Sequence, residues 1–254
     1  MQARLNHGQP LRYVFFAVLW LLLATAPAYA LLEEGKYTET EKVGFAFFKL
    51  GHIQPPYVEW VKATDLYKDA PPKERAALLE DQTVRLQKGF SLYMPDEDLI
   101  KVATIAPVRS PMLSDKDKAG KYHDVKPLQI LMAAGPNGYF PFYVGDMCIA
   151  IVPEHFDAFQ NIMVSNDVYS KMRKYLGIGN YQQVQKAYIE IVFRPNKADT
   201  SKPMTLDKTD TWLMSATIIN FEVWDITHQH FIWNYTSPAY VSDKTRNLLD
   251  LYGK

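Results

Sequence analysis

The sequence predicts an α+β fold in one domain, with a mostly antiparallel sheet, helices packed on one face of that sheet, and a signal peptide in front. Three observations support this prediction. Residues 1–30 have the pattern of an export signal, residues 37–92 have helical patterning, and residues 96–254 mix strand and helix patterns. Consecutive strand patterns joined by short turns favour antiparallel pairing. No stretch of flexible composition divides residues 31–254, so we expect one domain there.

The first 30 residues follow the order of a secretory signal. Arg4 and Arg12 precede an apolar run over residues 13–26, and Ala28 and Ala30 supply the small residues of a cleavage site. The run is shorter than the roughly 20 residues of a membrane-spanning helix. We expect cleavage after Ala30, no stable membrane span afterwards, and a periplasmic or secreted mature protein. The alternative is an uncleaved anchor, which would export the same body.

The charge balance bears on the class of partner. The chain has 28 basic and 28 acidic residues; without residues 1–30 it would have 26 and 28, a net charge near −2. Such a balance does not attract nucleic acid or an anionic surface, so we expect no nucleic-acid partner. Cys148 is the single cysteine and lies in an apolar run, which predicts a small buried side chain and no internal disulfide.

Helical signals fill the first part of the predicted domain. Thr38 and Glu41 have the spacing of a capping box, the apolar residues that follow lie on one helical face, and Gly51 comes just past the end. Proline pairs then begin a short second helix within residues 55–67 and a longer third helix within residues 71–89.

Strand signals dominate after residue 95. The expected strands cover residues 98–108, 126–134, 139–152 (a hairpin), 186–194, 211–224 and 231–235. A helix over residues 156–163 and a second one capped by Asn166 interrupt them, a polar loop spans residues 195–210, and a short helix closes the chain at residues 243–252.

Two histidines beside an aspartate form the first candidate site. In an extended segment His228 and His230 would project from one face, with Asp225 as a third possible zinc ligand across the turn. The alternative is an ordinary hairpin, because Asp225, Thr227 and Gln229 are typical turn and edge residues. The hairpin is the preferred interpretation, since zinc needs three or four ligands and no further ligand has a suitable spacing.

This hairpin, over residues 217–237, has a strand ending in aspartate, a polar turn and a strand that carries Trp233. It resembles a hairpin of several bacterial envelope proteins, including assembly factors related to the curli export lipoproteins. The cysteine to which those lipoproteins attach their lipid is absent here. The resemblance implies a role in the bacterial envelope.

A second candidate site lies where an apolar strand passes into a helix. Glu154, His155 and Asp157 occupy a position where acid–base groups often sit in enzymes. The competing interpretation is structural, since acidic residues favour the first turn of a helix and Pro153 suits its start.

Aromatic residues supply the remaining candidate, a contact patch for a protein, peptide or glycan. Its members are Tyr139, Phe140, Phe142, Tyr143, Trp224 and Trp233. The alternative is that each is buried in the core.

Together these patterns lead to three functional hypotheses. The first is an exported envelope protein without catalytic activity or cofactor that binds another envelope protein or peptide through a sheet edge or an aromatic patch. The second is an exported hydrolase, possibly zinc-dependent, that uses one of the two polar groups. The third is a small-ligand carrier with an apolar pocket between the sheet and the helices.

Overall fold

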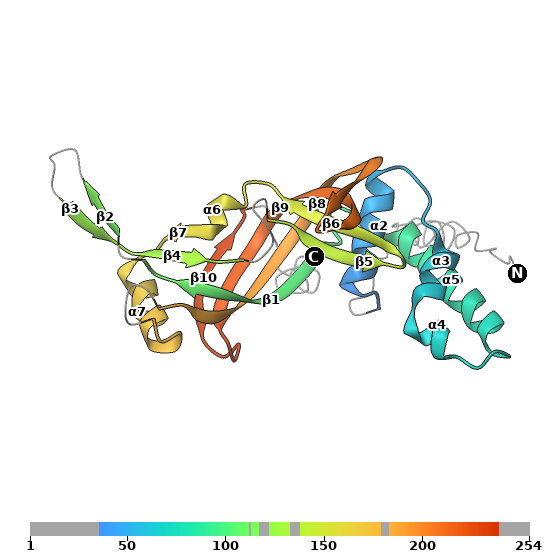
Figure 1. Cartoon of the computed structure of the whole chain (residues 1–254), viewed down its shortest axis with the longest axis horizontal. Coiled ribbons are helices and arrows are strands. Elements are labelled where there is room, and N and C mark those ends of the chain that lie inside the picture. Colours follow the sequence, from blue (N-terminus) through green and yellow to red (C-terminus); the bar gives the residue numbers. More distant parts are fainter. Residues whose placement is uncertain (1–35, 112, 117–121, 133–137, 179–182, 239–254) are drawn as a thin grey trace, which may run out of the picture. The chain divides into compact units, whose positions relative to one another are not determined.

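The computed structural model describes residues 36–111, 113–116, 122–132, 138–178 and 183–238 (Figure 1). These residues contain six helices and a large, mostly antiparallel sheet, so the predicted mixture of helix and antiparallel sheet is confirmed. They all belong to one compact unit, residues 31–254. The expected signal peptide and the expected helix at residues 243–252 lie outside the described residues. No helix in the described part is long and apolar enough to cross a membrane.

The helices largely follow the sequence signals. They are α2 (Glu39–Leu50), α3 (Tyr57–Ala63), α4 (Asp65–Asp69), α5 (Arg75–Leu92), α6 (Asp157–Gln160) and α7 (Asn166–Tyr175). The capping box of α2 is confirmed, because the Thr38 hydroxyl accepts from the Glu41 amide at 3.1 Å and the Glu41 carboxylate accepts from the Thr38 amide at 2.8 Å. The second predicted helix is divided at Thr64, whose extended backbone ends α3 and whose side chain caps α4.

Eight strands form the large sheet, in the order β5-β6-β9-β8-β1-β4-β7, with β10 also paired to β9. Their bounds are β1 (Ile100–Arg109), β4 (Pro127–Ile130), β5 (Phe140–Val144), β6 (Met147–Pro153), β7 (Asn161–Met163), β8 (Gln185–Leu206), β9 (Thr209–Asp225) and β10 (Phe231–Thr236). A separate pair, β2 (Leu113–Lys116) and β3 (Tyr122–Val125), forms a small hairpin. The pairing of β6 with β9 is parallel, and the other strand pairs are antiparallel.

The longest strands, β8 and β9, form one hairpin that the sequence only partly predicts. Their pairing extends to Leu206 opposite Thr209, with register shifts along the way. Asp207 and Lys208 make the turn with φ of 47° and 68°, as in type I′ turns. The predicted polar loop over residues 195–210 is therefore wrong. These residues are polar because they extend the hairpin toward solvent, and pairing with the strand that directly follows them decides their conformation.

The predicted helix pair after β6 is also corrected. Only α6 forms in the first half, and the residues up to Met163 turn into β7, which pairs with β4. The second helix, α7, is capped by Ser165 rather than Asn166, because the Ser165 hydroxyl accepts from the Val168 amide at 3.3 Å. Sheet pairing thus outweighs the apolar helical spacing of this short segment.

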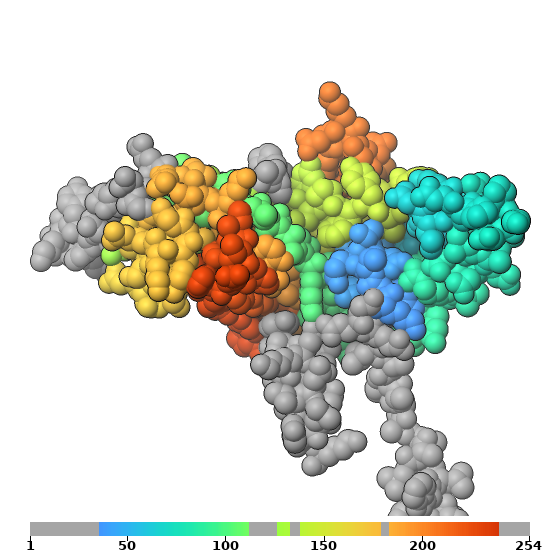
Figure 2. Space-filling view, turned by 90° about the horizontal axis from the view of Figure 1, so that it is seen from below, coloured from blue at the N-terminus to red at the C-terminus, as the bar shows by residue number. Residues whose placement is uncertain are grey.

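The buried side of α2 anchors the helical part to the sheet. Phe45 and Phe47 are almost completely inaccessible, and Phe47 meets Trp212 of β9 edge to face at 5.9 Å between ring centroids. In Figure 2 the blue α2 lies below the yellow-green strands β5 and β6 and beside the teal later helices. Phe140 of β5 packs against Phe193 of β8 at 5.2 Å, although these strands are not neighbours in the sheet. The sheet therefore curls so that its β5 edge lies over β8.

Candidate functional site

The turn between β9 and β10 is built around the carboxylate of Asp225. One oxygen accepts from the amides of Gln229 (2.8 Å) and His230 (2.9 Å). The other accepts from the Thr227 hydroxyl (2.6 Å) and lies 3.1 Å from Nδ1 of His230. These four contacts all lie within the turn, so Asp225 holds the turn together.

This network changes the acidity of Asp225. Burial by itself raises the pKa of the carboxyl group, but hydrogen bonds from Thr227, His230 and Gln229 outweigh burial and hold its pKa well below the usual range. The folded turn therefore stabilises the ionised carboxylate of Asp225. A carboxylate engaged in this way serves first as a structural acceptor.

The two histidines of the turn point to different neighbours. His228 has a φ of 56°, so the segment is not extended and the expected common face is lost. Its ring stacks on Tyr188 of β8 at 4.4 Å, whereas the ring of His230 stacks on Tyr175 of α7 at 4.2 Å. In the described part of the chain, no group of three or more His, Cys, Asp and Glu side chains is placed to hold a metal ion.

The other predicted polar group lies on an exposed turn. Glu154, His155 and Asp157 are all exposed where β6 leads into α6. The Glu154 carboxylate accepts from the Thr217 hydroxyl at 3.2 Å, which ties it to β9. His155 has a φ of 55°. The structure gives no contact between these three side chains.

The six aromatic residues of the predicted contact patch are divided among several places. Phe140 is buried and Phe142 packs against the core. The Tyr139 hydroxyl donates to Asp207 of the β8–β9 turn, and this bond is the largest cause that raises the Tyr139 pKa. Tyr143 is 65% exposed.

The two tryptophans of that set lie on opposite faces of the sheet. Trp233 is paired with Val223 and packs against Phe221, on the buried face. Trp224 follows Val223 in β9 and therefore faces the other way, toward the accessible face. The six residues thus form no single patch, and only Trp224 belongs to the surface described next.

Four apolar side chains form a continuous line across four strands on the accessible face. Ile105 is paired with Tyr188, Tyr188 with Trp224, and Trp224 with Phe231. We call this line the outer row. Its ends are exposed, with 54% of Ile105 and 37% of Phe231 accessible, while Tyr188 and Trp224 are half-buried. At a strand spacing of about 4.8 Å the outer row is roughly 14 Å long.

A polar line runs beside the outer row. Glu190 and Glu222 are directly paired across β8 and β9, and Asn234 of β10 is opposite Glu222. Glu222 accepts from the indole nitrogen of Trp224 at 2.9 Å, and Nε2 of His228 lies 3.7 Å from Glu190. The carboxylates thus fix the neighbouring aromatic rings in place. A fixed aromatic line with a polar border has the composition of a protein-binding surface.

The sequence alone predicted part of the outer row and of its polar border. Alternation over residues 186–194 put Tyr188 and Glu190 on the polar side of a strand, but it did not show which side chains of other strands would lie beside them. Ile105 and Phe231 carry no sequence signal of exposure, because apolar residues in strands are usually buried.

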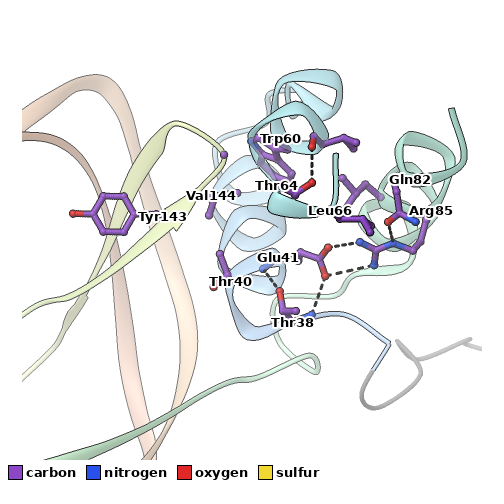
Figure 3. Close-up of a pocket in the computed structure, with 13 residues that line it drawn as sticks. Thr38, Thr40, Glu41, Trp60, Thr64, Leu66, Gln82, Arg85, Tyr143 and Val144 are labelled. Atoms are coloured by element: carbon purple, nitrogen blue, oxygen red, sulfur yellow. Dashed lines mark hydrogen bonds and ion pairs between the residues drawn. The ribbon is translucent and has the colours of Figure 1, made fainter. Parts of the chain in front are cut away.

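A cavity of about 260 Å³ lies in the helical part, between α2, α3, α5 and the β5–β6 turn (Figure 3). Its apolar lining includes Trp60, Val61, Leu86 and Val144. Figure 3 shows the ring of Tyr143 turned away from the other labelled side chains, so this lining residue contributes little beyond its backbone.

The polar border of this helix cavity is tied up in hydrogen bonds. Arg85 pairs with the Glu41 carboxylate and donates to Gln82 at 2.9 Å (Figure 3). Glu41 also closes the capping box with Thr38. Only Glu41 and Arg85 are charged among the lining residues, so the charges of the cavity balance.

The outer row and the helix cavity are the two candidate functional regions of the described residues. Comparison of the chain with protein-family models, curated proteins and solved structures finds no match. The function is therefore inferred from the residues of these two regions and from the sequence.

Proposed function

We propose that the chain is an exported protein of the bacterial envelope that binds another envelope polypeptide and performs no catalysis. In this proposal residues 1–30 are removed after Ala30, and residues 31–254 act as a single domain with helices on one face of the sheet. The outer row is the observation that carries the proposal. Aromatic residues on a fixed, accessible surface are enriched where proteins bind each other.

A polypeptide partner is favoured because the outer row ends at a sheet edge. Among the described residues, β10 pairs with β9 alone, and α7 contacts β10 near Phe231, where Lys171 Nζ lies 5.9 Å from the ring centroid. In this proposal a partner strand pairs along the other edge of β10. A strand added at this edge would lie beside Phe231 and extend the outer row by one position. Backbone pairing would supply affinity, and the row would supply specificity for alternate apolar side chains.

The polar groups predicted from the sequence support binding over hydrolysis. Asp225 is held by four contacts within its own turn, and the Glu154 carboxylate is bonded to Thr217. These hydrogen bonds support a structural role for the carboxylates of Asp225 and Glu154.

Site-specific photo-cross-linking in intact cells tests the proposal. A photoreactive amino acid at Asn234, which is exposed on β10, is expected to give adducts of discrete mass. The same amino acid at Val84, which is 57% exposed on α5, is the matched control and is expected to give none of these adducts. Adding Trp224→Ala to the Asn234 probe is expected to reduce adduct yield about tenfold, as for a central aromatic contact.

Two outcomes would contradict the proposal. The first is an adduct pattern that is the same from Asn234 and Val84, or absent from Asn234. The second is an intact amino terminus on protein found free in the cytosol, since mass spectrometry of the exported form should show a chain that begins at Leu31.

A further inference from the structure

One segment of β1 is held at both ends by backbone contacts that point away from β8. The Lys101 amide donates to the Glu39 carboxylate at 2.6 Å. The Pro107 carbonyl accepts from the Leu131 amide at 2.8 Å, just before β1 begins to pair with β4. Backbone groups of residues two apart in a strand point to the same edge. The odd-numbered residues from 101 to 107 therefore direct their amides and carbonyls away from β8.

Between these two contacts lies an open edge formed by Ala103 and Ile105, which we call the β1 window. In the described part of the chain, β1 pairs with β4 only from Val108 onward, and no other strand pairs along the window. Ala103 and Ile105 are exposed, and neither carries the charge that usually protects an edge strand. Their amides and carbonyls thus face no strand of the described residues, and an added strand is the structure that would satisfy all of them.

A cleft of about 360 Å³ adjoins the β1 window. Thr104 and Ala106 of β1 line one side of this cleft, and Phe140 and Pro141 of β5 line another. The residues of β8 that pair with Thr104 and Ala106 are completely buried, so the cleft adjoins the inner face of the sheet. Its volume exceeds the roughly 150 Å³ of an engineered apolar cavity that takes up benzene, so a leucine or phenyl side chain fits.

The lining of the cleft favours an apolar side chain. Its only charged residue is Asp207, which accepts a hydrogen bond from the Tyr139 hydroxyl. Side chains alternate between the two faces of a strand. A residue added opposite Thr104 would therefore direct its side chain to the inner face and the cleft. A residue added opposite Ile105 would direct its side chain to the accessible face, beside the outer row.

We propose that the β1 window binds an extended segment of another polypeptide by strand addition, with an apolar side chain of leucine size in the cleft. The backbone of that segment pairs with Ala103 and Ile105, and its alternate side chains extend the outer row. This assignment goes beyond the proposed function because it adds a second binding edge at the end of the outer row remote from β10. The tests of the two edges use different residues, so either one can fail alone.

Nuclear magnetic resonance of the protein, purified as the cell produces it, tests the β1 window with short peptides. The probe is acetyl-Thr-Leu-Thr-Leu-Thr-amide, whose threonines would pair with the window while a leucine enters the cleft. We expect saturable shifts of the amide signals of Ala103 and Ile105 and slower hydrogen exchange at both. The amide signal of Val84, which is 57% exposed on α5, is the control and should not shift.

Three modified peptides separate backbone pairing from side-chain binding. An N-methyl group on the central threonine removes an amide that points to β1, so binding should weaken about tenfold. The same group on the leucine after it changes an amide that points away from β1, so affinity should change less than about threefold. Serine in place of both leucines leaves the cleft without an apolar side chain and should also weaken binding about tenfold.

A variant of the protein tests the cleft from the other side. Thr104→Trp places a large ring in the cleft and keeps a residue that is favourable in strands, so the preference for the leucine peptide over the serine peptide should fall about tenfold. Val84→Trp on α5 is the matched control and should leave this preference unchanged. If Thr104→Trp does not fold, the three modified peptides with the wild type still decide the matter.

Every other outcome overturns the proposal or one part of it. Slow hydrogen exchange of Ala103 and Ile105 in the free protein would mean that this chain or a second copy already fills the window. If the probe gives no saturable shift at either amide, there is no binding edge at β1. Equal binding of the two N-methyl peptides would rule out strand addition, and equal binding of the leucine and serine peptides would rule out the cleft as a side-chain site.

Discussion

Replacing Asp225 by asparagine should destabilise the protein through the β9–β10 turn. Asparagine keeps the size of the side chain and one carbonyl oxygen, which can still accept from the amides of Gln229 and His230. The amide nitrogen that replaces the second oxygen cannot accept from the Thr227 hydroxyl. The variant therefore loses the negative charge and the hydrogen bond from Thr227, while the shape of the turn is retained.

The size of the effect follows from these contacts. Hydrogen bonds to a charged group contribute about 1.5–3 kcal/mol each and neutral ones about 1 kcal/mol. Gln229 and His230 are exposed, so water compensates part of the loss at their amides. We expect Asp225→Asn to cost about 1.5 kcal/mol, which lowers the thermal midpoint of a domain of this size by about 3–6 °C.

The effect should also depend on pH in a defined direction. The hydrogen bonds hold the pKa of folded Asp225 below the value near 3.9 of an unfolded aspartate. A lowered pKa contributes stability that is complete above the unfolded pKa and is lost as the pH falls toward the folded pKa. The advantage of the wild type over Asp225→Asn should therefore shrink by about 1 kcal/mol between pH 5 and pH 3.

Urea unfolding at pH 5 and pH 3 measures both quantities. Asp157→Asn, which changes an exposed carboxylate at α6, is the matched control and should alter stability by less than about 0.5 kcal/mol. The reasoning is refuted if Asp225→Asn is as stable as the wild type at pH 5. It is equally refuted if the difference between the two proteins is the same at both pH values.

Three further predictions concern other parts of the fold. Gly138→Ala should lower the urea midpoint of unfolding strongly, because φ at this position is 55° and the added Cβ would come within 2.1 Å of the buried ring of Phe156. Unchanged stability would contradict the close approach of Gly138 to Phe156. Glu41→Gln should lower the free energy of unfolding by at most about 1 kcal/mol, because its ion-pair partner Arg85 is partly exposed. This loss should be smaller in high salt, which urea unfolding at two ionic strengths would show. Tyr139 should ionise above the usual phenol range in an ultraviolet titration, and Asp207→Asn should lower its pKa, unless the bond between them is absent.

The sequence predicted correctly those helix caps, strands and turns whose interacting residues lie within a few positions of each other. The capping box needs only Thr38 and Glu41, because the partners are three positions apart. The alternation that predicted a strand over residues 186–194 reflects a period of two in side-chain direction, and these residues lie in β8. The polar turn at Asp225 was predicted on the same basis, since the aspartate bonds to residues that directly follow it.

Contacts between distant segments determined the candidate sites. The outer row requires the register of four strands, and the helix cavity requires that α2, α3 and α5 meet the β5–β6 turn. A local pattern gives the direction of a side chain within its own strand or helix but not the neighbour that it meets. For the same reason His228 and His230, one residue apart, were expected on one face and instead stack on rings of β8 and α7.

The sequence by itself thus determined the start of α2, the main strands and the turn that closes the last hairpin, because contacts between near neighbours suffice to form them. Only the tertiary structure decided that residues 195–210 continue a hairpin, that Trp224 and Trp233 lie on opposite faces of the sheet, and that α2, α3 and α5 meet the β5–β6 turn around a cavity. The first two outcomes depend on the register of hairpins, and the third depends on packing between segments far apart in the chain, whose relative placement is set by burying one common core.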